Sequence, residues 1–433
     1  MRRFLYFVSV FALMFSGACS FADGRSGADP GTSVQTPDSV TGPDTPDTPD
    51  TPDTPHTRPP SGTTQPGTAS PDTTPAPSAE MPTSPGVPSA SQDDDTTMTD
   101  PGQGDAPSED EAPPPEIEYT RPVFGFIDAH ADTITKAMER GQGLFRNNLH
   151  VDFERLYAYG APIQVFTVWC DDEYVNNAFE YANSAIDFFE SELERHNDII
   201  ELALSLSDLE RNARNNKISA ILALEGGEPL MGLIENLDHF YNRGVRLITL
   251  TWNRSNELGY GVGSGSNAGL TPFGVDCVRR MNELGIIIDV SHLNEAGFWD
   301  VDRLSTRPYI ASHSNAYSVA QNSRNLSDRQ ITAIVNSGGM IGINLYPPFL
   351  SNNRTASMNN IMRHINHFIG LGAGGNIGLG CDFDGIGSMP TGFSGVSSLG
   401  SLANAITDEL GADVSESIMS GNFYEYFVRF FDS

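Results

Sequence analysis

Imidazole and carboxylate side chains follow several short apolar segments of this sequence, at the point where each segment stops. The set comprises His130, Asp132, Glu225, His292 and His313. The chain holds only 9 histidines, so three of them at equivalent positions are hard to assign to chance. Imidazole nitrogens and carboxylate oxygens together suit zinc or a similar divalent ion. A carboxylate such as Glu225 can bridge two ions, and paired ions can polarise a carbonyl and generate a hydroxide nucleophile.

Each of these residues also has a less specific interpretation. His130 alone could be a hydrogen-bonded histidine at a strand end, and Glu225 before two glycines could cap a helix. His292 and His313 could each hydrogen-bond within a loop. The pattern His-X-Asp favours a shared site, because alternate residues of an extended chain lie on one face, so His130 and Asp132 can point the same way. Taken together, the five residues predict a metal site.

Eight short apolar segments are the elements that must position these side chains. The predicted strands are 123–128, 163–169, 219–224, 246–251, 286–290, 309–312, 340–345 and 377–381. Helical periodicity lies between them, at 178–195, 230–242, 272–284, 328–336, 358–370 and 398–410. Eight strand and helix repeats in about 310 residues fit a (β/α)8 barrel. A doubly wound open sheet is the alternative, weakened because no Gly-rich phosphate loop follows the first strand.

A barrel collects its chemistry at the carboxyl ends of its strands. The five residues above would then converge on one rim. Asp382 and Asp384 follow the last strand and join them there, as do Trp252 and Asn253 after the fourth strand.

The charge of the chain is unevenly distributed. Residues 20–120 carry 19 acidic and 2 basic side chains, and the first 19 residues add two arginines, which leaves −16 of the net −31 on residues 121–433. A domain this acidic repels polyphosphate, which argues against nucleic-acid binding. The 4 cysteines are too few for a disulfide scaffold, and Cys381 in the last strand is interpreted as buried packing rather than a zinc thiolate.

The first 120 residues have a different composition. Residues 1–19 read as a secretion signal, with two arginines, an apolar run from Phe4 to Phe15, small residues and then Cys19. This arrangement resembles a bacterial lipoprotein signal, with Cys19 as the lipidated residue; the alternative is ordinary cleavage near Ala18. Residues 20–120 hold 21 of the 29 prolines and few apolar residues, which predicts a disordered linker. We therefore expect an exported protein, anchored to a membrane of the cell envelope or at the cell surface.

The domain at 121–433 resembles the membrane dipeptidases, or renal-dipeptidase-like enzymes, of peptidase family M19. The resemblance extends from about Phe126 to Phe430. It rests on the motifs at 128–132, 150–152, 164–166, 223–227, 250–253, 289–292, 312–314, 324–325, 378–385 and 421–423. It implies a (β/α)8 TIM barrel of the metal-dependent hydrolase type with two zinc ions, and it implies small dipeptides as substrates.

The resemblance also implies individual roles. His130 and Asp132 would bind one zinc, Glu225 would bridge, and His292 and His313 would bind the other. Asp382 would take the proton from the attacking water as hydroxide forms. Arg324 would bind the free C-terminal carboxylate of the dipeptide, including dipeptides with a D-residue at that position. Asp384 competes with Asp382 for the catalytic role, and a structural salt bridge is the alternative for Arg324. A homodimer is also implied, although no surface pattern indicates it.

One position departs from the family pattern. The best-known members have a substrate-contacting histidine where this chain has Trp252. Indole can donate a hydrogen bond but cannot accept one, so we expect altered rate or specificity rather than lost hydrolysis. Asn253 is a candidate for the missing substrate contact, and Trp252 could simply line the pocket.

Two other functions compete with the dipeptidase. The first is another dinuclear-metal amidohydrolase with a bridging lysine, but Lys136 and Lys217 of the domain do not follow predicted strands. The second is a non-catalytic surface binding protein that retains the barrel. The intact set of candidate ligands argues against the second function.

Overall fold

The computed structural model describes residues 122–431. The predicted signal segment 1–19 with Cys19 and the predicted linker 20–120 lie outside the described residues. The strands are β1 Ile127–Asp128, β2 Ile163–Trp169, β3 Ile200–Leu202, β4 Ile218–Glu225, β5 Val245–Thr249, β6 Ile287–Asp289, β7 Ile341–Ile343 and β8 Ile377–Leu379.

Parallel strands follow one another in the order β6-β5-β4-β2-β1-β8-β7. Parallel bridges from Asp289 to Ile310 and from Ala311 to Ile341 join β6 to β7, so residues 310 and 311 occupy the eighth position and close the ring. The predicted (β/α)8 barrel is therefore confirmed, and the open sheet is excluded. The predicted strand 309–312 is reduced to these two bridges. The short β3 pairs with β4 beside the ring and was not predicted, because its three residues form no apolar run.

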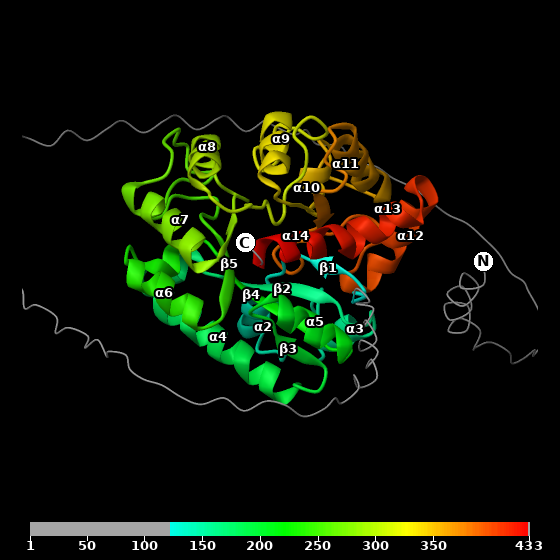
Figure 1. Ribbon diagram of the computed structural model, residues 1–433, viewed down its shortest axis with the longest axis horizontal. Helices are drawn as coiled ribbons and strands as arrows, with labels where there is room; N and C mark the ends of the chain where they lie inside the picture. Colours follow the sequence, from blue (N-terminus) through cyan, green and yellow to red (C-terminus); the bar gives the residue numbers. More distant parts are fainter. Residues whose placement is uncertain (1–121, 432–433) are drawn as a thin grey trace, which may run out of the picture. The chain divides into compact units, whose positions relative to one another are not determined.

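Helices surround the strands in the view of Figure 1. The α-helices are α2 Thr133–Arg140, α3 Phe153–Tyr157, α4 Ala178–Arg195, α5 Leu206–Arg214, α6 Ile234–Asn242, α7 Pro272–Leu284, α8 Glu295–Leu304, α9 Asp328–Ser337, α10 Pro347–Leu350, α11 Met358–Gly370, α12 Leu399–Leu410, α13 Ala412–Glu416 and α14 Asn422–Phe431. Short 3-10 turns are η1 Asp172–Asn177, η2 Glu228–Leu230 and η3 Val396–Ser398, and the single π-turn is η4 Ser417–Gly421.

Local sequence signals explain why several helix bounds agree with prediction. Helix α7 begins at Thr271, whose side chain accepts a hydrogen bond from the Gly274 amide, and Pro272 occupies its first position. It ends at Gly285, where φ is +72°, a conformation that glycine adopts without steric cost. Helices α4, α7 and α11 have the bounds that their periodicity predicts.

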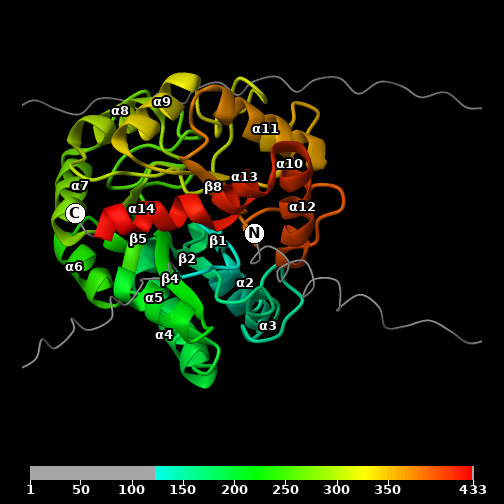
Figure 2. The same ribbon diagram turned by 45° about the vertical axis from the view of Figure 1, so that its right-hand side comes forward.

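The last helix helps to fill the barrel. Helix α14 crosses the strands in Figures 1 and 2, and its aromatic side chains share one buried cluster with inward-facing residues of β1, β2, β4 and β5. Gly378 in β8 makes room for it, because a Cβ there would lie 2.4 Å from the Phe423 ring. Asn422 Nδ2 donates to the carbonyls of Gly374 and Ile377, which fixes the start of the helix. The carboxyl ends of the strands are left for the site.

None of the helices within residues 122–431 is long and apolar enough to cross a bilayer.

Cys170, Cys277 and Cys381 are buried and free. Burial raises the pKa of the Cys381 thiol well above its ordinary value, which agrees with packing rather than metal ligation.

Candidate metal centre

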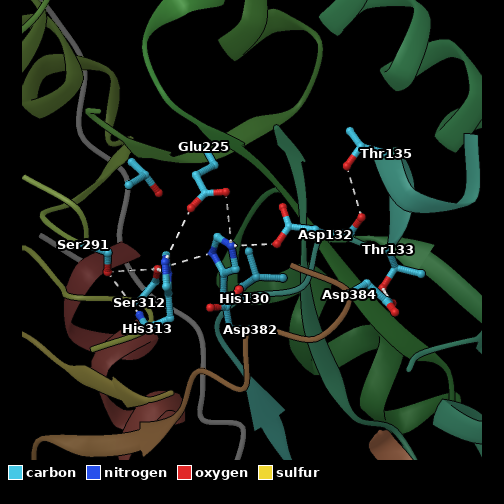
Figure 3. Close-up of polar contacts among 12 residues, drawn as sticks. His130, Asp132, Thr133, Thr135, Glu225, Ser291, Ser312, His313, Asp382 and Asp384 are labelled. Carbon is cyan, nitrogen blue, oxygen red and sulfur yellow. Dashed lines mark hydrogen bonds and ion pairs between the residues drawn. The ribbon is translucent and has the colours of Figure 1, made fainter. Parts of the chain in front are cut away.

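The five predicted metal ligands meet in one buried cluster at the carboxyl ends of the strands. His130 Nε2 lies 3.4 Å from Asp132 Oδ2 and 3.7 Å from Glu225 Oε2 (Figure 3). On the other side of Glu225, Oε1 lies 3.0 Å from His292 Nε2 and 3.5 Å from His313 Nε2. Two groups of donors, each able to hold one ion, therefore share the Glu225 carboxylate.

The chemistry of the donors fits divalent ions. His292 Nδ1 donates to Asn253 Oδ1 at 2.9 Å and His313 Nδ1 contacts Ser312 Oγ at 2.7 Å, so both Nε2 atoms are directed into the cluster. These two Nε2 atoms lie 2.9 Å apart and also face a carboxylate oxygen. Among the residues that the structure describes, His130 Nε2 and Asp132 Oδ1 are buried without a hydrogen-bond partner. Lone pairs converging in a buried space are what a metal ion satisfies.

Burial and charge shift the pKa values of the cluster. Burial, with the positive charge of Arg324 nearby, holds the pKa of His292 well below its ordinary value. The pKa of His313 is lowered in the same way. Burial raises the pKa of Glu225 to about 7, and the Asp132 carboxylate acts in the same direction. Neutral imidazole is the form that binds a metal, so the environment of His292 and His313 favours ligation.

Asp382 borders the cluster and is held by one side chain. Its Oδ2 accepts a hydrogen bond from Asn344 Nδ2 at 2.8 Å, and one oxygen lies within 4.8 Å of ligand atoms of His130 and His313. Burial raises the pKa of Asp382 to about 7. A carboxyl group with a pKa near 7 can both accept and return a proton at neutral pH.

Asp384 lies only two residues on but points elsewhere. Its Oδ2 accepts from Thr133 Oγ1 at 2.6 Å, as Figure 3 shows, and its Oδ1 accepts from the His150 amide at 2.7 Å. The Asp384 amide in turn donates to His150 Nδ1 at 3.0 Å. Both carboxylate oxygens are occupied, so Asp384 ties the loop after β8 to helix α2 and to the segment before α3. This geometry favours Asp382 over Asp384 for proton transfer.

Arg324 is buried beside the histidines. It is 6% exposed and lines a cavity of about 260 Å³ together with His292 and Ser314. Its guanidinium lies 5.4 Å from the Phe349 ring and donates to the His313 carbonyl at 3.3 Å, whereas Nε has no partner among the described residues. Burial lowers the pKa of Arg324 to about 10, which leaves the group charged at neutral pH. No carboxylate pairs with it within 4.0 Å in the described chain, so the salt bridge that was its alternative interpretation is not found.

A second cavity of about 540 Å³ opens onto the cluster. Asp132, Glu225, His292 and Asp382 line its floor, and Trp252 forms part of its wall. The Trp252 ring lies 5.2 Å from that of Trp169, which lines the same cavity. A volume of this size suits a small ligand.

Asn253 has a contact that the sequence did not predict. It lines the same cavity, but its Oδ1 accepts from His292 Nδ1. Asn253 therefore orients a candidate metal ligand, in addition to any contact with substrate.

Sequence reasoning missed Asn344, Asp289 and Ser312. Asn344 follows β7 directly, and the rule that polar residues at strand ends form the site would have found it. Asp289 ends β6 and Ser312 precedes His313, but nothing in their spacing indicates that they hydrogen-bond to each other. Lys217 pairs with Glu201, and Lys136, which lines the cavity, pairs with Glu139. Both ammonium groups are thus held in ion pairs, which argues against a bridging lysine.

Comparison with known proteins identifies the family. The model of the membrane dipeptidases, peptidase family M19, matches residues 121–427. The chain belongs to the membrane dipeptidase family. It is a metal-dependent dipeptidase, a hydrolase that acts on small peptides, and this excludes the non-catalytic alternative.

Individual members of the family are similar over much of the domain. A protein of Klebsiella pneumoniae encoded in the pqqA 5′ region is 38% identical over 218 residues, which are 48% of this chain and 80% of its own. The crystal structure of a family M19 dipeptidase superposes with a TM-score of 0.67 at 26% identity, covering 72% of this chain and all of its own. A metallopeptidase of Rhodobacter sphaeroides, solved with a phosphinate mimic of L-Ala-D-Ala, superposes with a TM-score of 0.66 at 25% identity, covering 71% and 99%.

Proposed function

We propose that this membrane dipeptidase is a dinuclear zinc enzyme that cleaves dipeptides with a free C-terminal carboxylate, including those with a D-residue at that position. The observation that carries the proposal is the Glu225 carboxylate, shared between His130 and Asp132 on one side and His292 and His313 on the other. Histidine and carboxylate donors in two groups of three are the ligand set of zinc.

Two bound zinc ions would polarise the peptide carbonyl and lower the pKa of the attacking water, so that hydroxide forms near neutral pH. The residues of the chain perform the remaining steps. Asp382, held by Asn344, takes a proton at its carboxylate and passes it to the leaving amine. The buried pocket limits the access of bulk water and keeps these charges strong.

Arg324 selects the length of the substrate in this proposal. Its buried guanidinium can hold a carboxylate through two parallel hydrogen bonds. A substrate that ends one residue after the scissile bond places its carboxylate there, whereas a longer peptide places a neutral amide beside a charged group. The proposed D-residue tolerance rests on the Rhodobacter sphaeroides relative, whose bound ligand mimics L-Ala-D-Ala.

Hydrolysis of a matched substrate panel tests the proposal. The purified protein is assayed on L-Ala-L-Ala, L-Ala-D-Ala, the C-terminally amidated dipeptide, tri-alanine and an N-blocked control, before and after treatment with a chelator. We expect cleavage of the two free dipeptides, loss of cleavage in the chelator and recovery on addition of zinc. Equal cleavage with and without chelator contradicts the metal mechanism, and equal cleavage of the amidated dipeptide contradicts the role of Arg324.

We also propose that the protein is exported, lipidated at Cys19 and held at the membrane through residues 20–120. This rests on the sequence signals alone. Incorporation of a labelled fatty acid by the native chain, lost in Cys19→Ala, tests it; a Cys19→Ala protein that stays in the membrane fraction contradicts it. The proposed homodimer is tested by light scattering, where a mass of one chain contradicts it.

A further inference from the structure

The Asp289 carboxylate at the end of β6 is fully buried and surrounded by donors. Its Oδ1 accepts from the Ser291 amide at 2.9 Å and from the Ser312 amide at 2.8 Å. Its Oδ2 accepts from Thr249 Oγ1 at 2.6 Å and from Ser312 Oγ at 2.5 Å. Four donors compensate the burial of one negative charge, so the carboxylate acts purely as an acceptor.

The contact between Asp289 and Ser312 fixes the direction of the hydrogen bond between Ser312 and His313. Ser312 has one hydroxyl proton, and the short contact with Asp289 takes it. The Ser312 oxygen can then only accept from its other close neighbour, His313 Nδ1 at 2.7 Å. The proton of the His313 ring is therefore on Nδ1, and the lone pair of Nε2 faces Glu225 and His292.

We propose that Asp289 and Ser312 form a relay that fixes the tautomer and orientation of His313 for metal binding. Both are positioning residues, since Ser312 contacts the ring of His313 and Asp289 acts on that ring through Ser312. The proposal rests on the dinuclear centre proposed above. Hydrogen bonds to the distal nitrogen of a ligating histidine orient the ring and raise its basicity as a ligand.

Other neighbours of Ser312 Oγ are more distant. His130 Nδ1 lies at 3.5 Å and Ser291 Oγ at 3.4 Å, both longer than the bonds to Asp289 and His313. The chain also supplies a matched control. Ser314 is buried one residue after His313, but its hydroxyl has no hydrogen-bond partner among the described residues.

Zinc affinity measured against a chromogenic chelator tests the relay in the full chain. Removal of such a partner typically weakens metal binding about 10- to 100-fold. We expect Ser312→Ala to weaken the binding of one of the two ions by this factor, and Ser314→Ala to leave both dissociation constants within about twofold of the wild type. Unchanged affinity in Ser312→Ala overturns the proposal, as does an equal loss in both variants.

Nitrogen NMR of the metal-free chain provides a readout that is independent of affinity. Labelled histidines distinguish Nδ1–H from Nε2–H tautomers, and His313→Ala identifies the resonances. We expect His313 to carry its proton on Nδ1 in the wild type. In Asp289→Asn an amide replaces the acceptor, so the Ser312 hydroxyl turns to His313 and the proton moves to Nε2. A wild-type His313 with its proton on Nε2, or an unchanged tautomer in Asp289→Asn, overturns the relay.

The metal centre and the relay can fail separately. A wild-type chain that binds no zinc contradicts the dinuclear centre itself. A wild type that binds two ions, with variants that bind them equally well, contradicts only the relay. A lower melting temperature of Ser312→Ala with wild-type affinity assigns Ser312 a structural role instead, which also overturns the proposal.

Discussion

The two sides of the metal centre differ in how the protein holds them. On the side of His292 and His313, each ring Nδ1 has an acceptor within 2.9 Å, supplied by Asn253 and Ser312. On the side of His130 and Asp132, the Nδ1 of His130 has only the 3.5 Å contact with Ser312, and Asp132 Oδ1 has no partner among the described residues.

The His292 and His313 side is therefore held by closer protein contacts than the His130 and Asp132 side. Orientation in advance lowers the entropy that binding costs. We therefore expect the two ions to bind with unequal affinity, the tighter one between His292, His313 and Glu225.

Loss of a candidate ligand on either side should have the largest effect. We expect both His130→Ala and His292→Ala to abolish turnover, because the proposed mechanism uses both ions, with circular dichroism unchanged. Metal analysis after gel filtration separates them: His130→Ala should retain close to one zinc per chain, and His292→Ala clearly less. Equal retention in the two variants would show that the two sides are equivalent.

Asp382 and Asp384 lie two residues apart, but we expect Asp382 to act in catalysis and Asp384 to stabilise the fold. Asp382→Asn should lower kcat by roughly 10²- to 10⁴-fold, because it removes proton transfer. Asp384→Asn should instead lower the free energy of unfolding by about 1–3 kcal/mol, because it disturbs bonds from Thr133 and His150. Kinetics and denaturant unfolding of both variants measure this; the reverse assignment of the two effects would contradict the site.

The buried side chain of His364 contacts the loop that follows His313. His364 Nδ1 accepts from the Ala316 amide at 3.1 Å, and burial lowers the pKa of His364 to about 4. An unfolded histidine titrates near 6.5. The unfolded chain therefore binds more protons between these values, so this stabilisation is complete above pH 6.5 and is lost as the pH falls towards 4.

The loss amounts to about 3 kcal/mol across that range. His364→Gln cannot titrate, so its unfolding free energy should depend less on pH between 4 and 6.5. Denaturant unfolding of the metal-free wild type and variant at several pH values measures the difference. Parallel pH profiles would rule out a contribution of His364 to the stability of the His313 side.

Trp252 gives the smallest expected effect, because it belongs to neither half. An aromatic pair such as Trp252 and Trp169 contributes about 0.5–1.5 kcal/mol beyond its buried area. Trp252 also lines the cavity, and a comparable contact with an apolar substrate side chain would be lost in Trp252→Ala, so KM should change by roughly 2- to 10-fold for dipeptides with large apolar side chains. Zinc affinity should stay unchanged, and a weaker affinity would extend the oriented side of the centre to Trp252.

Much of the fold and the ligand set could be predicted because both depend on local signals. Apolar segments placed all eight positions of the barrel, with the bridged residues 310 and 311 inside the predicted strand 309–312, and helical periodicity placed the bounds of α4, α7 and α11. The strand-end rule brought His130, Asp132, Glu225, His292 and His313 to one rim. The pairing of β3 with β4 escaped prediction, because tertiary pairing defines it and a three-residue segment carries no periodicity.

The side chains that reach the rim could be predicted from residue order, because parallel strands in a barrel all end on the same side. The directions in which they point from there depend on the folded backbone. His292, Asp382 and Asp384 have positive φ angles of +66°, +60° and +68°, so the alternation of an extended chain does not hold at these positions. For this reason Asp382 faces Asn344 and the ligands, whereas Asp384 faces Thr133. The contacts of Asn253 with His292 and of Ser312 with His313 likewise depend on the tertiary structure.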